Sequence, residues 1–271
     1  MSAAHQLVVL IDPVARRIDG ESVRIAKDVL CAGAQAKICW PQDPEEFARA
    51  LARRGGRRTV VVGDDQALLR TVTLLHKERE LDRGALALVP VGPAASLELA
   101  RTLGVPLGAV AAARAVLEGT ERRLDLLVDD SDGVVLGALR IPALTRPAPV
   151  APVAPSTVWG TCRSLVRTLV RAPAPVAAVA HRLRVEADGI LLTDVDRPVA
   201  GVSLASADGL AQVVVHGRSG ERVRAAARAV TVSGSVSTGG FRYRADEVVA
   251  GPVRTRTWTA LAGAWGLVLP G

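Results

Sequence analysis

The residues best suited to chemistry lie in a short polar turn that follows an apolar strand. Gly63, Asp64, Asp65 and Gln66 come directly after the β-branched run 60–62, and apolar residues at helical spacing follow them. A strand, a tight turn and a helix start form the usual cradle for a phosphate group, because the first amides of a helix have no intrahelical partners. Asp65 is also a suitable helix N-cap. The turn therefore predicts either a nucleotide site or a well-formed strand–helix corner.

A second glycine-containing turn follows the next apolar strand. Residues 85–89 read as that strand, and Pro90-Val91-Gly92-Pro93-Ala94-Ala95 comes after it, with Ser96 leading into a helical segment. The carboxyl ends of parallel strands meet at one edge of a sheet. We therefore expect the turns at Gly63 and Gly92 to lie side by side and to form one pocket.

These elements belong to an alternating pattern that changes near residue 140. Alternating strands and helices predict a mostly parallel sheet that is covered on both faces. Two Asp-Gly pairs farther on, at 188–189 and 208–209, predict β-hairpins. The expected strands are 7–11, 36–39, 59–62 and 85–89, and the expected helices are 21–30, one opening at Asp43, 65–76, 95–103, 107–118 and 156–169.

The two turns resemble the catalytic region of the diacylglycerol and sphingosine kinase family. That family's phosphate loop reads Gly-Gly-Asp-Gly-Thr, and Gly63 and Asp65 match it. Its second loop, Pro-x-Gly-Thr-Gly-Asn, is similar to residues 90–95, and its continuation Leu-Ala-Arg-x-Leu-Gly-x-Pro matches residues 99–106. The segment 115–126 and the Asp12-Pro13 turn after the first strand resemble further family motifs. The resemblance covers roughly residues 7–139 well and residues 180–270 weakly.

The resemblance implies a two-domain α/β protein. Its fold would be an N-terminal three-layer Rossmann-like parallel-sheet domain followed by a C-terminal antiparallel β-sandwich domain. We place the kinase-like domain at 1–139, a Pro-rich connector at 140–155 and a β-rich, lipid-binding-like domain at 156–271. We also expect the C-terminal tail to return to the first domain.

The same resemblance implies ATP and magnesium as cofactors, with Asp65 associated with the metal. The general base of the family comes from an Asp-Gly-Glu segment, for which Glu247 is the candidate here, although Val248 holds the family's glutamate position. In a strand, that one-residue shift would turn the carboxylate of Glu247 to the opposite face. The implied nucleotide contacts are Asp12, Gly63, Asp64, Asp65, Gln66, Gly92 and Ser96.

Several substitutions weaken the implied phosphate cradle. Gln66 replaces a glycine of the first loop, Ala67 removes a threonine hydroxyl, and Pro93 deletes an amide donor from the second loop. Ala94 and Ala95 replace the glycine and asparagine that follow. Two hypotheses stay open: an ATP-dependent lipid kinase, and a non-catalytic pseudokinase that acts as a lipid- or nucleotide-binding or regulatory module. The residue chemistry favours the second.

Composition restricts the partners. The net charge of +7 comes almost entirely from arginine, but Phe, Trp and Tyr make up only 3% of the 271 residues, which disfavours a nucleic-acid partner. A lipid substrate or an anionic membrane surface fits the charge better. Three cysteines without C-x-x-C spacing and four scattered histidines indicate neither a disulfide framework nor a metal site. No apolar run approaches the roughly 20 residues that span a bilayer, so we expect a cytoplasmic protein with peripheral membrane contact.

Overall fold

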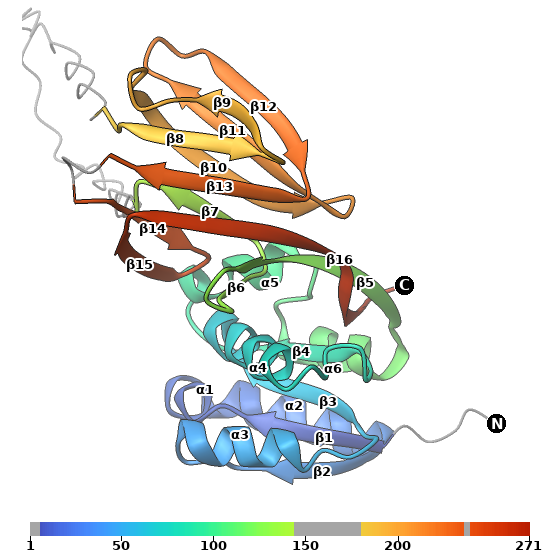
Figure 1. Ribbon diagram of the computed structural model, residues 1–271. Coiled ribbons are helices and arrows are strands. Elements are labelled where there is room, and N and C mark those ends of the chain that lie inside the picture. The colour runs from blue at the N-terminus through green and yellow to red at the C-terminus, as the bar shows by residue number, and fades with distance from the viewer. Residues whose placement is uncertain (1–5, 144–179, 236–238) are drawn as a thin grey trace, which may run out of the picture.

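The computed structural model describes residues 6–143, 180–235 and 239–271 of the chain (Figure 1). The predicted helix at 156–169 and the prolines at 147, 149, 152 and 155 lie outside the described residues. So do Cys162 and His5.

The first part of the chain forms a parallel sheet covered by helices on both faces. Its strands have the order β2-β1-β3-β4, and successive residues of β1 point alternately into two apolar cores, with Val8 and Leu10 in one and Leu7 and Val9 in the other. The strands are β1 (Gln6–Ile11), β2 (Gln35–Cys39), β3 (Arg58–Gly63) and β4 (Leu86–Pro90). The helices are α1 (Pro13–Ile18), α2 (Gly20–Gly33), α3 (Pro44–Ala52), α4 (Asp65–Lys77), the 3-10 helix η1 (Ala94–Ser96), α5 (Glu98–Thr102) and α6 (Ala109–Glu118).

The second part of the chain is a β-sandwich. One face is an antiparallel sheet of order β12-β11-β10-β7-β14-β15, and the other contains β16, β13, β8 and β9. Between them lies an apolar core in which Tyr243 and Trp258 pack edge to face at 5.2 Å between ring centroids. The strands are β5 (Thr120–Asp129), β6 (Val134–Val135), β7 (Ala138–Ile141), β8 (Leu183–Ala187), β9 (Ile190–Thr193), β10 (Val199–Ala207), β11 (Leu210–Gly217), β12 (Arg222–Ala227), β13 (Ala229–Gly234), β14 (Phe241–Ala245), β15 (Val248–Val253) and β16 (Thr255–Leu269).

Strand β16 joins the two parts. Its first residues pair with β13, as at Trp258 opposite Val230, and its last residues pair with β5 and, at Leu267 opposite Leu86, with β4. Figure 1 shows this long strand, in red, running along the border between the β-sandwich and the helical part. One ten-stranded sheet therefore passes through both parts. The division at 140–155 stays a prediction, and β7 ends inside that range at Ile141.

The predicted fold class is confirmed: an α/β part with a mixed sheet and a separate antiparallel sheet that completes a sandwich. Both Asp-Gly hairpins are also confirmed, because Asp188, Gly189, Asp208 and Gly209 all have the positive φ that such tight turns require. The predicted helix at 95–103 is wrong in extent, since η1 and a five-residue α5 replace it. Among the described residues, no helix combines the length and the apolar character needed to cross a bilayer.

Candidate functional site

The two turns meet at the carboxyl edge of the parallel sheet. Strand β1 has β2 on one side and β3 on the other, so the strand order reverses beside β1, and ligands of open α/β sheets bind at such a point. The amide of Asp12, just after β1, donates to the carbonyl of Val62 at 2.9 Å, and the amide of Val91 donates to the carbonyl of Gly63 at 2.9 Å. The expectation that both turns lie side by side is confirmed.

Asp64, and not Asp65, caps helix α4. Its backbone is extended, with φ −92° and ψ −174°, and its carboxylate accepts the amide of Ala67 at 3.1 Å. Asp65 is the first residue of the helix, so its predicted N-cap role is wrong. Gln66, in the same first turn, is exposed to solvent. The position with the extended backbone becomes the cap, and here it is one residue earlier than expected.

The carboxylate of Asp65 is buried and serves a different helix. Only 2% of Asp65 is exposed, and its two oxygens accept the amides of Leu99 at 2.7 Å and Ala100 at 2.9 Å. Those amides belong to the first turn of α5, where intrahelical partners are missing. Burial raises the pKa of Asp65 although both amides lower it, and the nearby charges of Asp64 and Glu247 raise it further.

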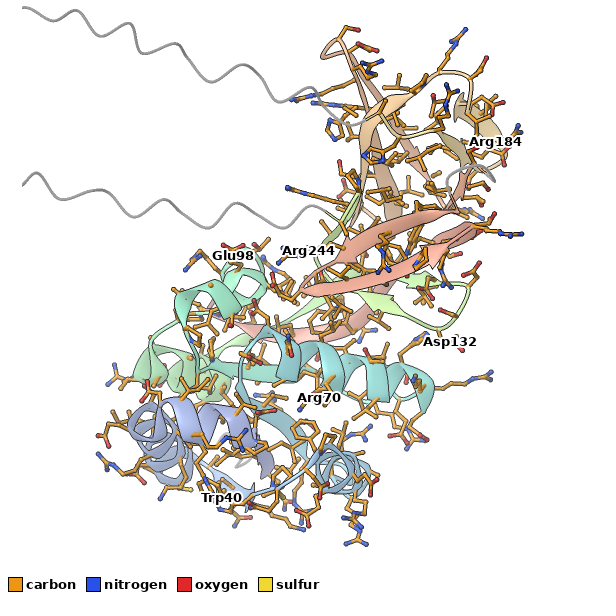
Figure 2. All side chains as sticks on the ribbon, turned by 90° about the vertical axis from the view of Figure 1, so that its left-hand side faces the viewer. Trp40, Arg70, Glu98, Asp132, Arg184 and Arg244 are labelled. Carbon is orange, nitrogen blue, oxygen red and sulfur yellow. The ribbon has the colours of Figure 1, made fainter. Side chains whose placement is uncertain are left out.

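Asp12 has both of its carboxylate oxygens in use as well. One oxygen accepts the amide of Val14 at 2.7 Å and caps α1, and the other accepts the guanidinium of Arg70 at 2.8 Å. Arg70 is labelled in Figure 2 on helix α4, and its guanidinium carbon also lies 5.7 Å from the ring centroid of Phe47. The arginine that could attract a phosphate at this edge is therefore already paired with an acid.

The loop residues of the site are held by local packing. A Cβ added to Gly63 would lie 2.7 Å from the Cβ of Ala67 and 3.0 Å from the Cβ of Asp12, so packing alone requires glycine there. Gly92 is less crowded, since an added Cβ would lie 3.4 Å from that of Asp64. Ser96 is half-buried in η1, and its amide donates to the carbonyl of Pro93 at 2.8 Å.

A hairpin turn from the β-sandwich reaches the same edge. Asp246 follows β14 with a φ of +49°, and its carboxylate accepts the amides of Leu136 at 2.9 Å, Gly137 at 2.8 Å and Ala138 at 3.2 Å. Burial raises the pKa of Asp246, the three amides lower it, and the charge of Asp65 raises it further. A Cβ added to Gly137 would lie 2.9 Å from a carboxylate oxygen of Asp246 and 3.1 Å from the side chain of Leu99, so this turn lies close to α5.

Glu247 is the second residue of that turn and lies outside both strands. The strand-face argument for Glu247 is therefore wrong, because a turn residue does not follow the alternation of a strand. Its carboxylate pairs with the guanidinium of Arg244 at 2.7 Å. Figure 2 places Arg244 where the β-sandwich meets the helical part. Val248, at the position of the family's glutamate, is 47% exposed and offers no proton acceptor.

The residues present do not fit a magnesium ion at Asp65. Magnesium at kinase sites is held by one or two carboxylates together with substrate phosphates, so the carboxylate must be accessible to the metal. Asp65 is only 2% exposed, and both of its oxygens already accept amides. No local pattern predicts the partners of Asp65, or Arg70 as the partner of Asp12, because these contacts join residues 34 to 58 positions apart.

Comparison with known proteins supports the fold. No protein-family model matches the chain, and no curated protein matches it. A crystal structure of a diacylglycerol kinase from Bacillus anthracis strain Sterne superposes with a TM-score of 0.72 at 13% identity, covering 99% of this chain and 98% of that one. Two structures of a candidate diacylglycerol kinase from the same strain give TM-scores of 0.74 and 0.71 at 13% and 12% identity, with the same coverage. The chain thus has the fold of these diacylglycerol kinase structures over nearly its whole length.

Proposed function

We propose that this protein is a diacylglycerol kinase-fold protein without phosphoryl transfer, which acts as a non-catalytic lipid- or nucleotide-binding module. One observation carries the proposal. The carboxylate of Asp65, the acid of the phosphate-loop motif, is buried and bound by the amides of Leu99 and Ala100. An acid in that position serves the fold, and its burial disfavours the ionised form that a metal requires.

The charge balance of the edge supports the same proposal. Phosphoryl transfer depends on positive charge and donors placed around the transferring group. The cations Arg70 and Arg244 are paired with Asp12 and Glu247, and the carboxylate of Asp64 caps a helix beside them. Neither of these two arginines is left unpaired for a triphosphate.

The loops keep only part of the donor set of the kinase family. Pro93 contributes no amide, Ala67 has no hydroxyl, and the side chain of Gln66 faces solvent. The amides in the first turn of α4, at Asp65 and Gln66, are still geometrically suited to an anion. These remaining amides are consistent with binding of a nucleotide without turnover.

An active ATP- and magnesium-dependent lipid kinase is the second candidate, favoured by one specific observation. The amide of Gly137 donates to Asp246, and a Cβ added to Gly137 would lie 3.1 Å from the side chain of Leu99. The amide of Leu99 in turn donates to Asp65, so the acid segment from which the family draws its base lies near the phosphate-loop acid. Activity would require Glu247 to leave Arg244 and take the role of the base.

The two candidates differ in their response to Mg-ATP. We expect labelled ATP with mixed lipids to give no phospholipid product above background. We also expect magnesium to add nothing to any stabilisation by millimolar ATP, because Asp65 does not hold the metal. A variant with a repaired loop, Gln66→Gly with Ala67→Thr, serves as the matched control and should gain stabilisation by nucleotide if the lost donors are the cause. A shift of about 5 °C in the natural protein that requires magnesium and is removed by Asp65→Asn would contradict the proposal.

A further inference from the structure

The outward face of the second sheet carries a group of arginines. Strands β7, β12 and β14 contribute Arg140, Arg222, Arg224, Arg242 and Arg244, which we call the arginine face. Four of them are exposed and Arg244 is half-buried. Their neighbours along each strand, such as Leu139 and Tyr243, point into the sandwich core. Alternation therefore puts all five on the side away from that core.

The strand register joins these side chains into one surface. Arg224 lies opposite Val214, Val214 opposite Ser203, Ser203 opposite Arg140, and Arg140 opposite Arg244, in a single row across five strands. Next to this row, the pKa of His216 is lowered by burial and by the charges of Arg222, Arg140 and Arg224. The arginines on both sides of His216 are thus close enough to act on one group.

The charge of the arginine face is not balanced internally. The outward positions of β7, β10, β11, β12 and β14 hold no aspartate or glutamate, and within the described residues only Arg244 of the five has an acidic partner, Glu247. Like charges directly opposite one another, as at Arg140 and Arg244, destabilise a sheet. By contrast, Arg184 on the other sheet pairs with Glu186 and Asp194. The fold gains nothing from this clustering, which points to an anionic partner.

The arginine face borders the candidate site and an apolar rim. Arg244 belongs to both the face and the ion pair with Glu247. On the edge strand β15, Val249 lies opposite Arg244 on the same side of the sheet and is 50% exposed. A basic surface with an exposed aliphatic side chain at its margin fits the headgroup layer of a bilayer. No aromatic residue occupies the outward positions of these strands, so the stacking groups that single-stranded nucleic acid needs are missing there.

We propose that the arginine face docks this protein onto a membrane surface rich in anionic phospholipid. This inference deepens the proposed function, because it identifies the anionic partner as a lipid surface. It rests on the proposed function only for the choice of lipid over other anions. Docking there brings the hairpin of Asp246 and Glu247, and the carboxyl edge beyond it, to the bilayer.

The test is sedimentation of the full chain with vesicles, without nucleotide. One set of vesicles is pure phosphatidylcholine, and the other is an equal mixture of phosphatidylcholine and phosphatidylglycerol. The face variant is Arg140→Gln, Arg222→Gln and Arg224→Gln. The matched control is Arg17→Gln, Arg53→Gln and Arg114→Gln, which removes the same charge from exposed positions on the helical part. Thermal melts establish that both variants fold.

We expect binding to the mixed vesicles only, weakened about a hundredfold in the face variant, because each basic residue at an anionic surface contributes roughly fivefold, and unchanged in the control. Equal weakening in both variants would overturn the proposal, since overall charge would then suffice. Absence of vesicle binding would overturn it too, as would retention on DNA that the face variant alone loses. Because no ATP is present, each outcome is independent of whether the protein turns over nucleotide.

Discussion

The carboxyl edge of the parallel sheet and the arginine face differ in how their charged side chains are paired. At the edge, Asp12, Asp64, Asp65 and Asp246 all have carboxylate oxygens that accept backbone amides of this chain. On the arginine face, Arg140, Arg222, Arg224 and Arg242 have no acidic partner within the described residues. The acids in the region with the kinase-like motifs thus have partners within the chain. The arginines in the region without motifs, by contrast, have no acidic partner among the described residues.

This difference separates two uses of a carboxylate. A carboxylate that must bind a metal needs free lone pairs, whereas one that caps a helix or a loop contributes stability instead. Because Asp65 has the amides of Leu99 and Ala100 as partners, its match to the kinase motif no longer indicates its role. Motif residues therefore have to be judged by their partners, as well as by their positions in the sequence.

The largest expected effect is at Asp246. Replacement by alanine leaves the amides of Leu136, Gly137 and Ala138 without their acceptor and puts alanine at a φ of +49°. We expect a loss of about 3 kcal/mol in the free energy of unfolding. Asp64→Ala, which removes a single cap contact, should cost about 1 kcal/mol. Urea titration of both variants measures the difference, and equal costs would show that Asp246 is not a structural acid.

A second expectation concerns pH and Asp65. Because the folded pKa of Asp65 is raised by burial, its contribution to stability is full below its unfolded pKa and is lost as pH rises through the folded pKa. The free energy of unfolding of the natural protein minus that of Asp65→Asn should therefore decrease from about pH 4 towards neutrality. Urea melts of the two proteins across this range measure it. A difference that increases with pH would indicate that the pKa of Asp65 is lowered, as expected for a carboxylate that binds a cation.

At Asp129 the pH dependence should have the opposite sign. Burial alone would raise its pKa, but hydrogen bonds from Ser131 and Gly133, together with the charge of Arg256, outweigh burial and lower it. The stability that Asp129 contributes is present above its unfolded pKa and is lost as pH falls through the folded one. Asp129→Asn, measured beside Asp65→Asn, therefore shows whether the pH response belongs to the candidate site.

The smallest expected effect is at Glu247. Its ion pair with Arg244 is partly exposed, so Glu247→Gln should change the free energy of unfolding by less than about 1 kcal/mol. The same change frees Arg244 for the arginine face and should strengthen binding to anionic vesicles by roughly fivefold. Vesicle sedimentation measures this gain. Unchanged binding would show that Arg244 is not part of the docking surface.

Local sequence signals predicted much of the fold. The apolar runs of β1 and β3, the Asp43-Pro44 helix start and both Asp-Gly hairpins follow from residue type and short-range geometry, and the structure contains each of them. Such features depend on neighbours a few residues away. The brief strand β6 has no such signal, because it forms only by pairing with β5.

The candidate site was less predictable because its contacts are long-range. The sequence placed the turns at Gly63 and Gly92 on one edge, but the partner of Asp65 lies in α5 and the partner of Asp12 in α4. The arginine face likewise depends on the register of five strands, which brings Arg140 of β7 opposite Arg244 of β14. Pairing of this kind is set by the packed fold, not by spacing along the chain.

The most direct test of the account is a crystal structure of the protein grown with Mg-ATP. The account predicts that the carboxylate of Asp65 still accepts the amides of Leu99 and Ala100, and that no metal is bound to it. A triphosphate held between the turns of Gly63 and Gly92, with a magnesium ion on Asp65, would contradict it.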